Sequence, residues 1–155
     1  MTWRIESPLG ALALETQGDA IVRLDFVEDC DAPAPQEGVA LEAARQLAAY
    51  FEGSLRAFDL PVRPQGTEFQ QRVWSALQGI PYGKTRSYLD LARQLGDANA
   101  TRAVGAANGQ NPIAIFIPCH RVIGTNGKLT GYAGGLERKR RLLELEGALA
   151  RTLWT

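Results

Sequence analysis

Short apolar or alternating stretches, separated by turn residues, fill the first part of the chain. Three such stretches cover residues 2–6, 11–16 and 20–27. Gly10 and the Gln17-Gly18-Asp19 sequence lie between them and have the chemistry of turns. The pattern therefore predicts three strands of an antiparallel meander with one buried face.

A helix and a linker are predicted to follow the strands. Apolar residues recur at helical spacing over residues 39–52, and Gly53 is expected to end that helix. Phe58 and Leu60 predict one last short strand. The Pro61–Gly66 segment has the composition of a linker.

Beyond the linker the pattern becomes helical. Thr67 is expected to cap a helix that buries Val73 and Trp74, and Ser87 is expected to cap a second one. Asn99 or Thr101 should cap a third, over residues 102–108. Two short helices joined by a glycine-containing turn have the outline of a helix-turn-helix, although many helical bundles share it. A last helix is predicted from leucines at positions 136, 142, 143 and 145.

Charge divides the chain in the same place. Residues 1–65 carry 5 basic and 11 acidic side chains, a net charge of −6, whereas residues 66–155 carry 12 and 6, a net charge of +6. The basic part could face a polyanion such as DNA, or the division could reflect chance and solubility. Charge alone does not decide between these two interpretations.

Composition excludes several classes of protein. No apolar run approaches the roughly 20 residues of a membrane span, and the first residues lack the pattern of a signal peptide, so we expect a cytoplasmic protein. The cysteines are Cys30 and Cys119, and His120 is the only histidine. This is too few for a disulfide framework or a zinc site, so no metal is expected. Cys30 lies at the edge of a predicted loop, and we expect it to take no part in the function.

The sharpest chemical feature is the sequence Pro118-Cys119-His120-Arg121, which follows the apolar run of residues 113–117. A cysteine acts as a nucleophile through its thiolate, and histidine can take its proton near neutral pH. The alternative is a buried structural cysteine beside an incidental histidine. In an extended segment the two side chains would point to opposite faces, so a bridging water or a tight turn at Pro118 is required. Glu144 and Glu146 are the candidates for orienting the histidine.

Segments on both sides of this cysteine carry a family resemblance. Residues 111–124 resemble the active-site segment of O6-alkylguanine-DNA alkyltransferases, also called methylated-DNA–protein-cysteine methyltransferases. Four further blocks match in order and spacing: residues 87–88, 101–108, 131–136 and 145–147. The resemblance is strong over residues 67–147 and loose over residues 1–65.

The resemblance implies an α/β fold in two domains. Residues 1–63 would form a ribonuclease-H-like domain with a small antiparallel sheet and a helix. Residues 67–155 would form a mainly helical, winged-helix-like domain that binds DNA and carries the active site. The protein would use no cofactor, and we expect a monomer whose partner is double-stranded DNA containing O6-alkylguanine.

The implied reaction moves an alkyl group from O6-alkylguanine, and also from O4-alkylthymine, to Cys119. It would follow flipping of the base out of the duplex and would be irreversible, with one turnover per molecule. His120 would act as a base through water, Glu146 would orient it, and Asn111 would stiffen the active-site turn. The implied catalytic residues are Cys119, His120, Glu146, Asn111 and Tyr88.

Other residues would hold the DNA and the base. Arg102 would fill the space of the flipped nucleotide, with its helix in the minor groove, and Tyr88 would contact the base and assist release of guanine. The Val122 carbonyl and the Ala133 amide would read the purine edge. The implied DNA-binding residues are Arg102, Ala103, Ala106, Thr101, Ser87 and Arg121. The implied pocket residues are Val122, Tyr132, Ala133, Gly134, Lys139 and Asn108.

Two other functions remain open at this point. A cysteine hydrolase using Cys119 and His120 would turn over repeatedly and would need an oxyanion hole, which nothing in the sequence marks. A non-catalytic DNA-binding module would keep all of its function when Cys119 is replaced by serine.

Overall fold

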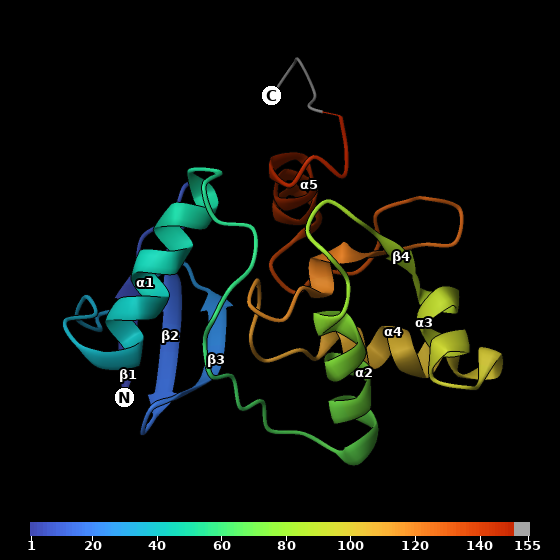
Figure 1. Cartoon of the computed structure of the whole chain (residues 1–155), viewed down its shortest axis with the longest axis horizontal. Coiled ribbons are helices and arrows are strands. Elements are labelled where there is room, and N and C mark those ends of the chain that lie inside the picture. The colour runs from blue at the N-terminus through green and yellow to red at the C-terminus, as the bar shows by residue number, and fades with distance from the viewer. Residues whose placement is uncertain (151–155) are drawn as a thin grey trace. The chain divides into compact units, whose positions relative to one another are not determined.

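The computed structural model describes residues 1–150, which fall into two compact units (Figure 1). The first unit contains residues 1–66 together with 112–116, and the second contains residues 67–111 and those from 117 onward. The expected division into residues 1–63 and 67–155 did not include the return of residues 112–116 to the first unit. The last five residues of the second expected domain lie outside the described residues.

The first unit is built on a three-stranded antiparallel sheet in the order β1-β2-β3. Its strands are β1 (Thr2–Ile5), β2 (Leu12–Gln17) and β3 (Ala20–Phe26). Alternation along β2 places Leu12 and Leu14 in the core, and Leu24 of β3 joins them, all with no exposed surface. The three strands predicted from the sequence are thus confirmed.

Helix α1 (Gly38–Phe51) packs on this sheet and buries Ala43, Leu47 and Tyr50. The helix predicted over residues 39–52 is confirmed. Gln46 of α1 uses its side chain twice on one residue: it accepts from the Asp59 backbone N–H at 2.9 Å and donates to the Asp59 carbonyl at 3.2 Å.

The short strand predicted around Phe58 and Leu60 is wrong. The backbone groups of Asp59, which a strand ladder would need, are taken by Gln46, and Pro61 has no N–H to donate. Sheet-like pairing is limited to one isolated bridge between Val62 and Ile21 of β3.

A second segment, residues 112–116, pairs with β3 in the first unit. Leu24 donates its N–H to the Pro112 carbonyl at 3.0 Å and accepts from the Ala114 N–H at 2.9 Å. Ile115 is fully buried with a φ of 70°, a left-handed conformation that is costly for a β-branched residue. The ring of Phe116 meets that of Phe58 edge-on at 4.8 Å. The apolar run before the cysteine is therefore anchored through backbone pairing and packing.

The second unit is mainly helical, as expected. Its helices are α2 (Glu68–Gln78), α3 (Tyr88–Gln94), α4 (Thr101–Gly109) and α5 (Leu136–Leu145). A two-stranded parallel sheet pairs β4 (Arg86–Ser87) with β5 (Val122–Ile123). Within residues 1–150, no helix combines the length and the apolar character that a bilayer span requires.

Two of the predicted helix caps are confirmed. Thr67 accepts from the Gln70 N–H while the Gln70 side chain accepts from the Thr67 N–H, and Ser87 exchanges the same pair of bonds with Asp90. The buried Trp74 of α2 donates its indole N–H to the Ala107 carbonyl of α4 at 2.8 Å. This bond and the packing of α2 and α3 on α4 fix the position of α4.

The cap predicted for the third helix is wrong. A short 3₁₀ turn, Ala98–Ala100, runs directly into α4, and the Asp97 side chain caps that turn by accepting from the Asn99 N–H. Thr101 instead donates its hydroxyl to the Ala98 carbonyl. The pair α3 and α4 keeps the helix-turn-helix outline.

The capping box of α2 gives a stability prediction. Thr67→Ala removes the acceptor for the Gln70 N–H and should lower the free energy of unfolding by about 1 kcal/mol. Ser75→Ala, at an exposed interior position of the same helix, is the control and should not destabilise the protein. Denaturant unfolding curves measure both, and equal midpoints for the two variants would contradict the capping role.

Candidate active site

Cys119 begins a buried 3₁₀ turn, Cys119–Arg121, and does not lie in an extended segment. The turn is tight from its first residue: the Cys119 N–H donates to the Ile117 carbonyl at 2.8 Å and the Arg121 N–H donates to the Pro118 carbonyl at 3.0 Å. The tight turn at Pro118, one of the two solutions considered from the sequence, is thus observed. Cys119 itself is 6% exposed.

Two asparagines, Asn108 in the last turn of α4 and Asn111 just after this helix, hold the 3₁₀ turn. Asn108 donates its side-chain amide to the Cys119 carbonyl at 3.3 Å, and Asn111 donates to the Ile117 carbonyl at 2.8 Å. Each asparagine therefore adds a second hydrogen bond to a carbonyl that already accepts a backbone N–H of the turn. The backbone around the sulfur is therefore fixed from α4.

The environment of the thiol favours its protonated form. Burial raises the pKa of Cys119 above its ordinary value, while a hydrogen bond from Asn111 and the positive charge of Lys139 act in the opposite direction. A thiolate forms here only if another group takes the proton.

The candidate for that group is the next residue in the sequence, and it is bound to a carboxylate. His120 is fully buried, and its Nε2 lies 2.8 Å from Oε2 of Glu146, the residue that ends α5. Burial lowers the pKa of His120, although the hydrogen bond and charge of Glu146 oppose this effect. A neutral imidazole is the form that can accept a proton.

Glu146 is also held by Arg121. The guanidinium donates from Nε to Oε1 at 2.8 Å and from Nη2 to Oε2 at 3.0 Å, a two-pronged pairing. Burial alone would raise the pKa of Glu146, but the interactions with His120 and Arg121 outweigh it and lower the pKa to about 2. The carboxylate is thus ionised throughout the physiological range.

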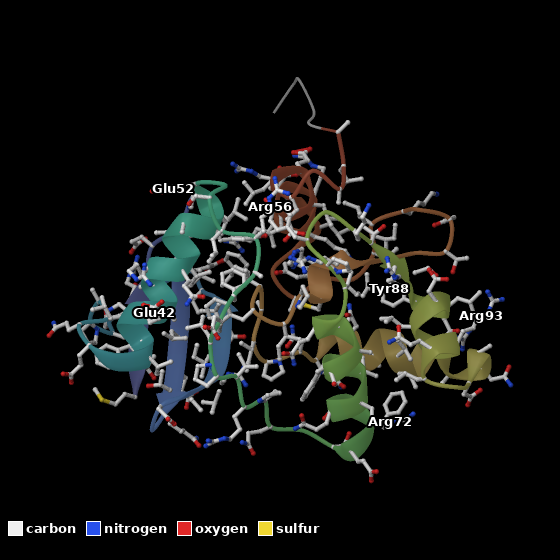
Figure 2. All side chains as sticks on the ribbon, in the orientation of Figure 1. Glu42, Glu52, Arg56, Arg72, Tyr88 and Arg93 are labelled. Atoms are coloured by element: carbon white, nitrogen blue, oxygen red, sulfur yellow. The ribbon has the colours of Figure 1, made fainter. Side chains whose placement is uncertain are left out.

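A second cluster joins α3 to α5 through one backbone carbonyl. The Tyr88 hydroxyl, at the start of α3 (Figure 2), donates to the Thr130 carbonyl at 3.0 Å, and Nζ of the buried Lys139 donates to the same oxygen at 2.7 Å. Nζ also lies 5.8 Å from the centre of the Tyr88 ring. Burial lowers the pKa of Lys139 to about 8, against the attraction of Cys119.

Three buried polar atoms in this unit have no hydrogen-bond partner within the described protein. They are Nδ1 of His120, Oδ1 of Asn108 and the hydroxyl of Tyr132. Buried polar atoms are normally paired, so these three hold unused hydrogen-bonding capacity near the thiol turn. In residues 1–150, no three His, Cys, Asp or Glu side chains gather as a metal site would require.

The face of α4 that would meet DNA is open. Arg102, Ala103 and Ala106 are exposed, whereas Val104 and Ala107 on the other side are buried. Thr101 is half-buried where α4 begins. This arrangement presents one arginine and two small side chains to solvent.

The placement of Arg121 on the DNA surface requires correction. Its side chain is 8% exposed, and its Nη1 donates to the Ile80 carbonyl at 2.6 Å in addition to its two bonds to Glu146. A guanidinium with these three donors engaged inside the protein is not available to a phosphate. Arg121 belongs to the buried network around Glu146.

Comparison with known proteins matches both parts of the chain. The family model of the 6-O-methylguanine DNA methyltransferase DNA-binding domain matches residues 68–148. The family model of the ribonuclease-like domain of the same proteins matches residues 4–64. The chain belongs to the 6-O-methylguanine DNA methyltransferase family. The expected order, a ribonuclease-like sheet domain followed by a helical DNA-binding domain, is confirmed.

Relatives of this 6-O-methylguanine DNA methyltransferase family member are similar over nearly their whole length. The methylated-DNA–protein-cysteine methyltransferase of Mycobacterium tuberculosis is 53% identical over 94% of this chain and 92% of its own. That of Methanosarcina acetivorans is 50% identical over 92% and 96%. The structure of Mycobacterium tuberculosis OGT in complex with DNA has a TM-score of 0.87 and 52% identity, covering 95% of this chain and 92% of that one.

The structure separates the site residues predicted for a methyltransferase into groups. Cys119, His120, Glu146 and Asn111 are joined by the contacts described above, and Tyr88 meets Lys139 at the Thr130 carbonyl. Of the two orienting acids considered, Glu146 contacts the histidine, whereas Glu144 pairs with Arg140. Val122 begins β5, and Tyr132, Ala133 and Gly134 precede α5.

Three contributors to this methyltransferase site were missed. The carbonyls of Ile80 and Thr130 accept from Arg121 and Lys139, and backbone oxygens carry no signal in a sequence. Tyr82 donates its hydroxyl to the Leu145 carbonyl at 3.2 Å, and its ring lies 5.9 Å from the Arg121 guanidinium carbon. Tyr82 lies between Pro81 and Gly83, and such neighbours are typical of a turn and give no signal of a site.

Lys139 gives a prediction about stability and pH. Because its pKa is lowered in the folded protein, the unfolded chain binds more protons between about pH 8 and 10.5, and the cost of burying the ammonium is fully present below pH 8. Lys139→Met should therefore raise the free energy of unfolding by about 1–2 kcal/mol at neutral pH, after the loss of its hydrogen bond, with the gain shrinking above pH 8.

The control for this substitution is Lys128→Met, which removes an exposed lysine. It should change stability little at any pH. Denaturant unfolding at several pH values measures both variants, and a destabilised Lys139→Met protein at pH 7 would show that the ammonium is a net stabilising group.

Proposed function

We propose that this protein repairs alkylated DNA by moving the alkyl group of O6-alkylguanine onto Cys119. One observation carries the proposal. Cys119, the only buried thiol of the described chain, lies in a tight turn, and the histidine that follows it in this turn is bound to an ionised glutamate. The relatives named methylated-DNA–protein-cysteine methyltransferases, at about half identity over almost the whole chain, support the same reaction.

In the proposed reaction the Cys119 sulfur attacks the alkyl carbon attached to O6. A carbon–sulfur bond forms as the carbon–oxygen bond breaks, and the bonding electrons leave with guanine. His120 takes the thiol proton through water at Nδ1, and an equivalent proton is passed from the imidazolium to the guanine anion as it departs, so that the imidazole ends neutral and charge balances. Because a thiolate is a poor leaving group from the thioether product, the free thiol is not regenerated and each molecule reacts once.

The proposal requires the damaged base to leave the helix, since O6 of a stacked guanine cannot enter a buried site. The exposed face of α4 supports this step: Ala103 and Ala106 leave room for a groove wall, and Arg102 is long enough to fill the space of the flipped nucleotide. Tyr88 would exchange its bond to the Thr130 carbonyl for one to the base and assist release of guanine.

The pocket proposed for the base would be lined by backbone groups of two segments and by polar and small residues. The Val122 carbonyl and the Ala133 amide would read the purine edge, between Gly134, Tyr132 and Asn108, with Lys139 nearby. The unpaired Tyr132 hydroxyl and Asn108 oxygen support the presence of a polar ligand.

Ser87 and Thr101 would contact the DNA backbone beside α3 and α4. O4-alkylthymine, action as a monomer and a cytoplasmic location belong to the same proposal.

Replacing the nucleophile tests the proposal. Cys119→Ser should bind duplex DNA containing O6-methylguanine but gain no methyl group, because a serine hydroxyl is a far weaker nucleophile. Wild-type protein should gain one methyl group per molecule, on the peptide containing Cys119, by intact and peptide mass spectrometry.

The matched control is Cys30→Ser, which removes the other cysteine and should transfer like the wild type. Repeated turnover, with many substrates consumed per protein molecule, would instead indicate a hydrolase. An unmodified wild-type protein after excess damaged DNA would reject alkyl transfer altogether.

Arg102 gives a second test. Arg102→Ala should lower the single-turnover rate on duplex DNA by at least about tenfold, since an extruded base costs a few kcal/mol to hold outside the helix. The rate with the free alkylated base, which needs no extrusion, should stay within about twofold of the wild type. Arg93→Ala, an exposed arginine of α3 (Figure 2), is the matched control for charge. Equal losses on duplex and free base would show that Arg102 acts elsewhere.

A further inference from the structure

Arg121 lies inside the second unit and connects three segments of it. Its guanidinium binds both oxygens of Glu146 at the end of α5 and the Ile80 carbonyl after α2. The Tyr82 ring lies near it, and the Tyr82 hydroxyl binds the Leu145 carbonyl. The side chain is therefore built into the support of the carboxylate.

The Glu146 carboxylate needs such a partner for physical reasons. Its side chain has no exposed surface, and burial of an unpaired carboxylate would cost several kcal/mol. Glu146 also ends α5, where the partial negative charge of the helix terminus disfavours an anion. A neutral histidine supplies one hydrogen bond and no charge, so the compensating charge comes from Arg121.

An ionised Glu146 determines where the proton of His120 lies. The carboxylate can only accept, so the imidazole must donate from Nε2 across the 2.8 Å contact. In the neutral ring, Nδ1 is then an unprotonated acceptor, and it is the ring nitrogen without a partner among residues 1–150. We infer that Arg121 is a positioning residue: by holding Glu146 as an ionised acceptor, it keeps the His120 proton on Nε2 and leaves Nδ1 able to take the Cys119 proton.

Removing the positive charge should reverse this arrangement. With Arg121 absent, the buried Glu146–His120 pair is left with a net negative charge and takes up a proton more readily. The proton goes either to the ring, giving an imidazolium, or to Glu146, which then donates to Nε2 and leaves the ring proton on Nδ1. In both forms Nδ1 carries a proton and can no longer act as a base.

Other charges near the pair do not replace Arg121. Lys139 also acts on His120 to lower its pKa, and Cys119, Arg138 and Glu146 act on the pKa of the nearby Tyr132 hydroxyl. The hydrogen bonds that hold the Glu146 carboxylate come from His120 and Arg121, and of these two residues Arg121 brings the positive charge.

The inference rests on the proposed function for its meaning, but its first test does not need the reaction. His120 is the only histidine of the chain, so the ¹⁵N signals of its ring can be assigned without ambiguity. Near pH 7, wild-type protein should show a neutral ring protonated on Nε2. Arg121→Met should show Nδ1 protonated at that pH, and its titration should lie about one pH unit or more above that of the wild type.

Single-turnover transfer gives the second readout. For Arg121→Met, the acidic limb of the pH–rate profile should move to higher pH, so that the rate falls roughly tenfold near pH 7 and recovers on the alkaline side. Arg121→Lys keeps the charge and should keep the wild-type limb. Arg141→Met, an exposed arginine of α5, controls for net charge. A purely structural role would lower the rate equally at every pH.

The outcomes separate the two proposals. A wild-type ring protonated on Nδ1 near pH 7, or identical ring titrations for wild type and Arg121→Met, would overturn the role of Arg121 whatever the reaction. If Arg121→Met does not fold, the tautomer of the wild-type ring and the pH–rate profile of Arg121→Lys still test the role. An acidic limb that lies at a different pH in Arg121→Lys than in the wild type would also overturn the positioning role of Arg121. If the His120 ring has the expected tautomer and titration but the protein transfers no alkyl group, the proposed function alone is rejected.

Discussion

The arrangement of the residues around Cys119 and His120 depends on one carboxylate that is kept ionised inside the protein. Glu146 has no exposed side-chain surface and stands at the end of α5, where the helix itself opposes a negative charge. Arg121 and His120 compensate it, and together they lower its pKa against the effect of burial. These demands explain why the 3₁₀ turn, the loop after α2 and the end of α5 are bound together at this point.

Burial has opposite effects on two neighbouring groups. It lowers the pKa of His120 and so favours a neutral imidazole, whereas it raises the pKa of Cys119 and keeps the thiol protonated, so the resting protein holds an acid and a base side by side. Rigidity comes from elsewhere: Asn108 and Asn111 hold the turn from α4, and the preceding residues pair with β3 around the strained Ile115. A fixed geometry of this kind is what a displacement at carbon requires.

Much of this could be predicted from the sequence because it depends on local signals. Alternation gave β1 to β3, helical spacing with Thr67 and Ser87 gave α2 and α3, and the family blocks indicated Cys119, His120 and Glu146. The failures concern partners far along the chain. Asp59 is bound by Gln46, so no strand forms there, and Arg121 is bound by Glu146 and the Ile80 carbonyl, so it is not at the surface. A basic residue in a basic region looks the same in a sequence whether its partner is a phosphate or a buried carboxylate.

The Glu146→Gln variant tests whether an ionised Glu146 prepares the histidine to activate the thiol. The substitution keeps size and removes charge, so the single-turnover rate of methyl transfer to Cys119 should fall by roughly 100-fold or more while affinity for damaged duplex DNA is unchanged. A folded Glu146→Gln protein that transfers the methyl group at the wild-type rate would contradict the claim.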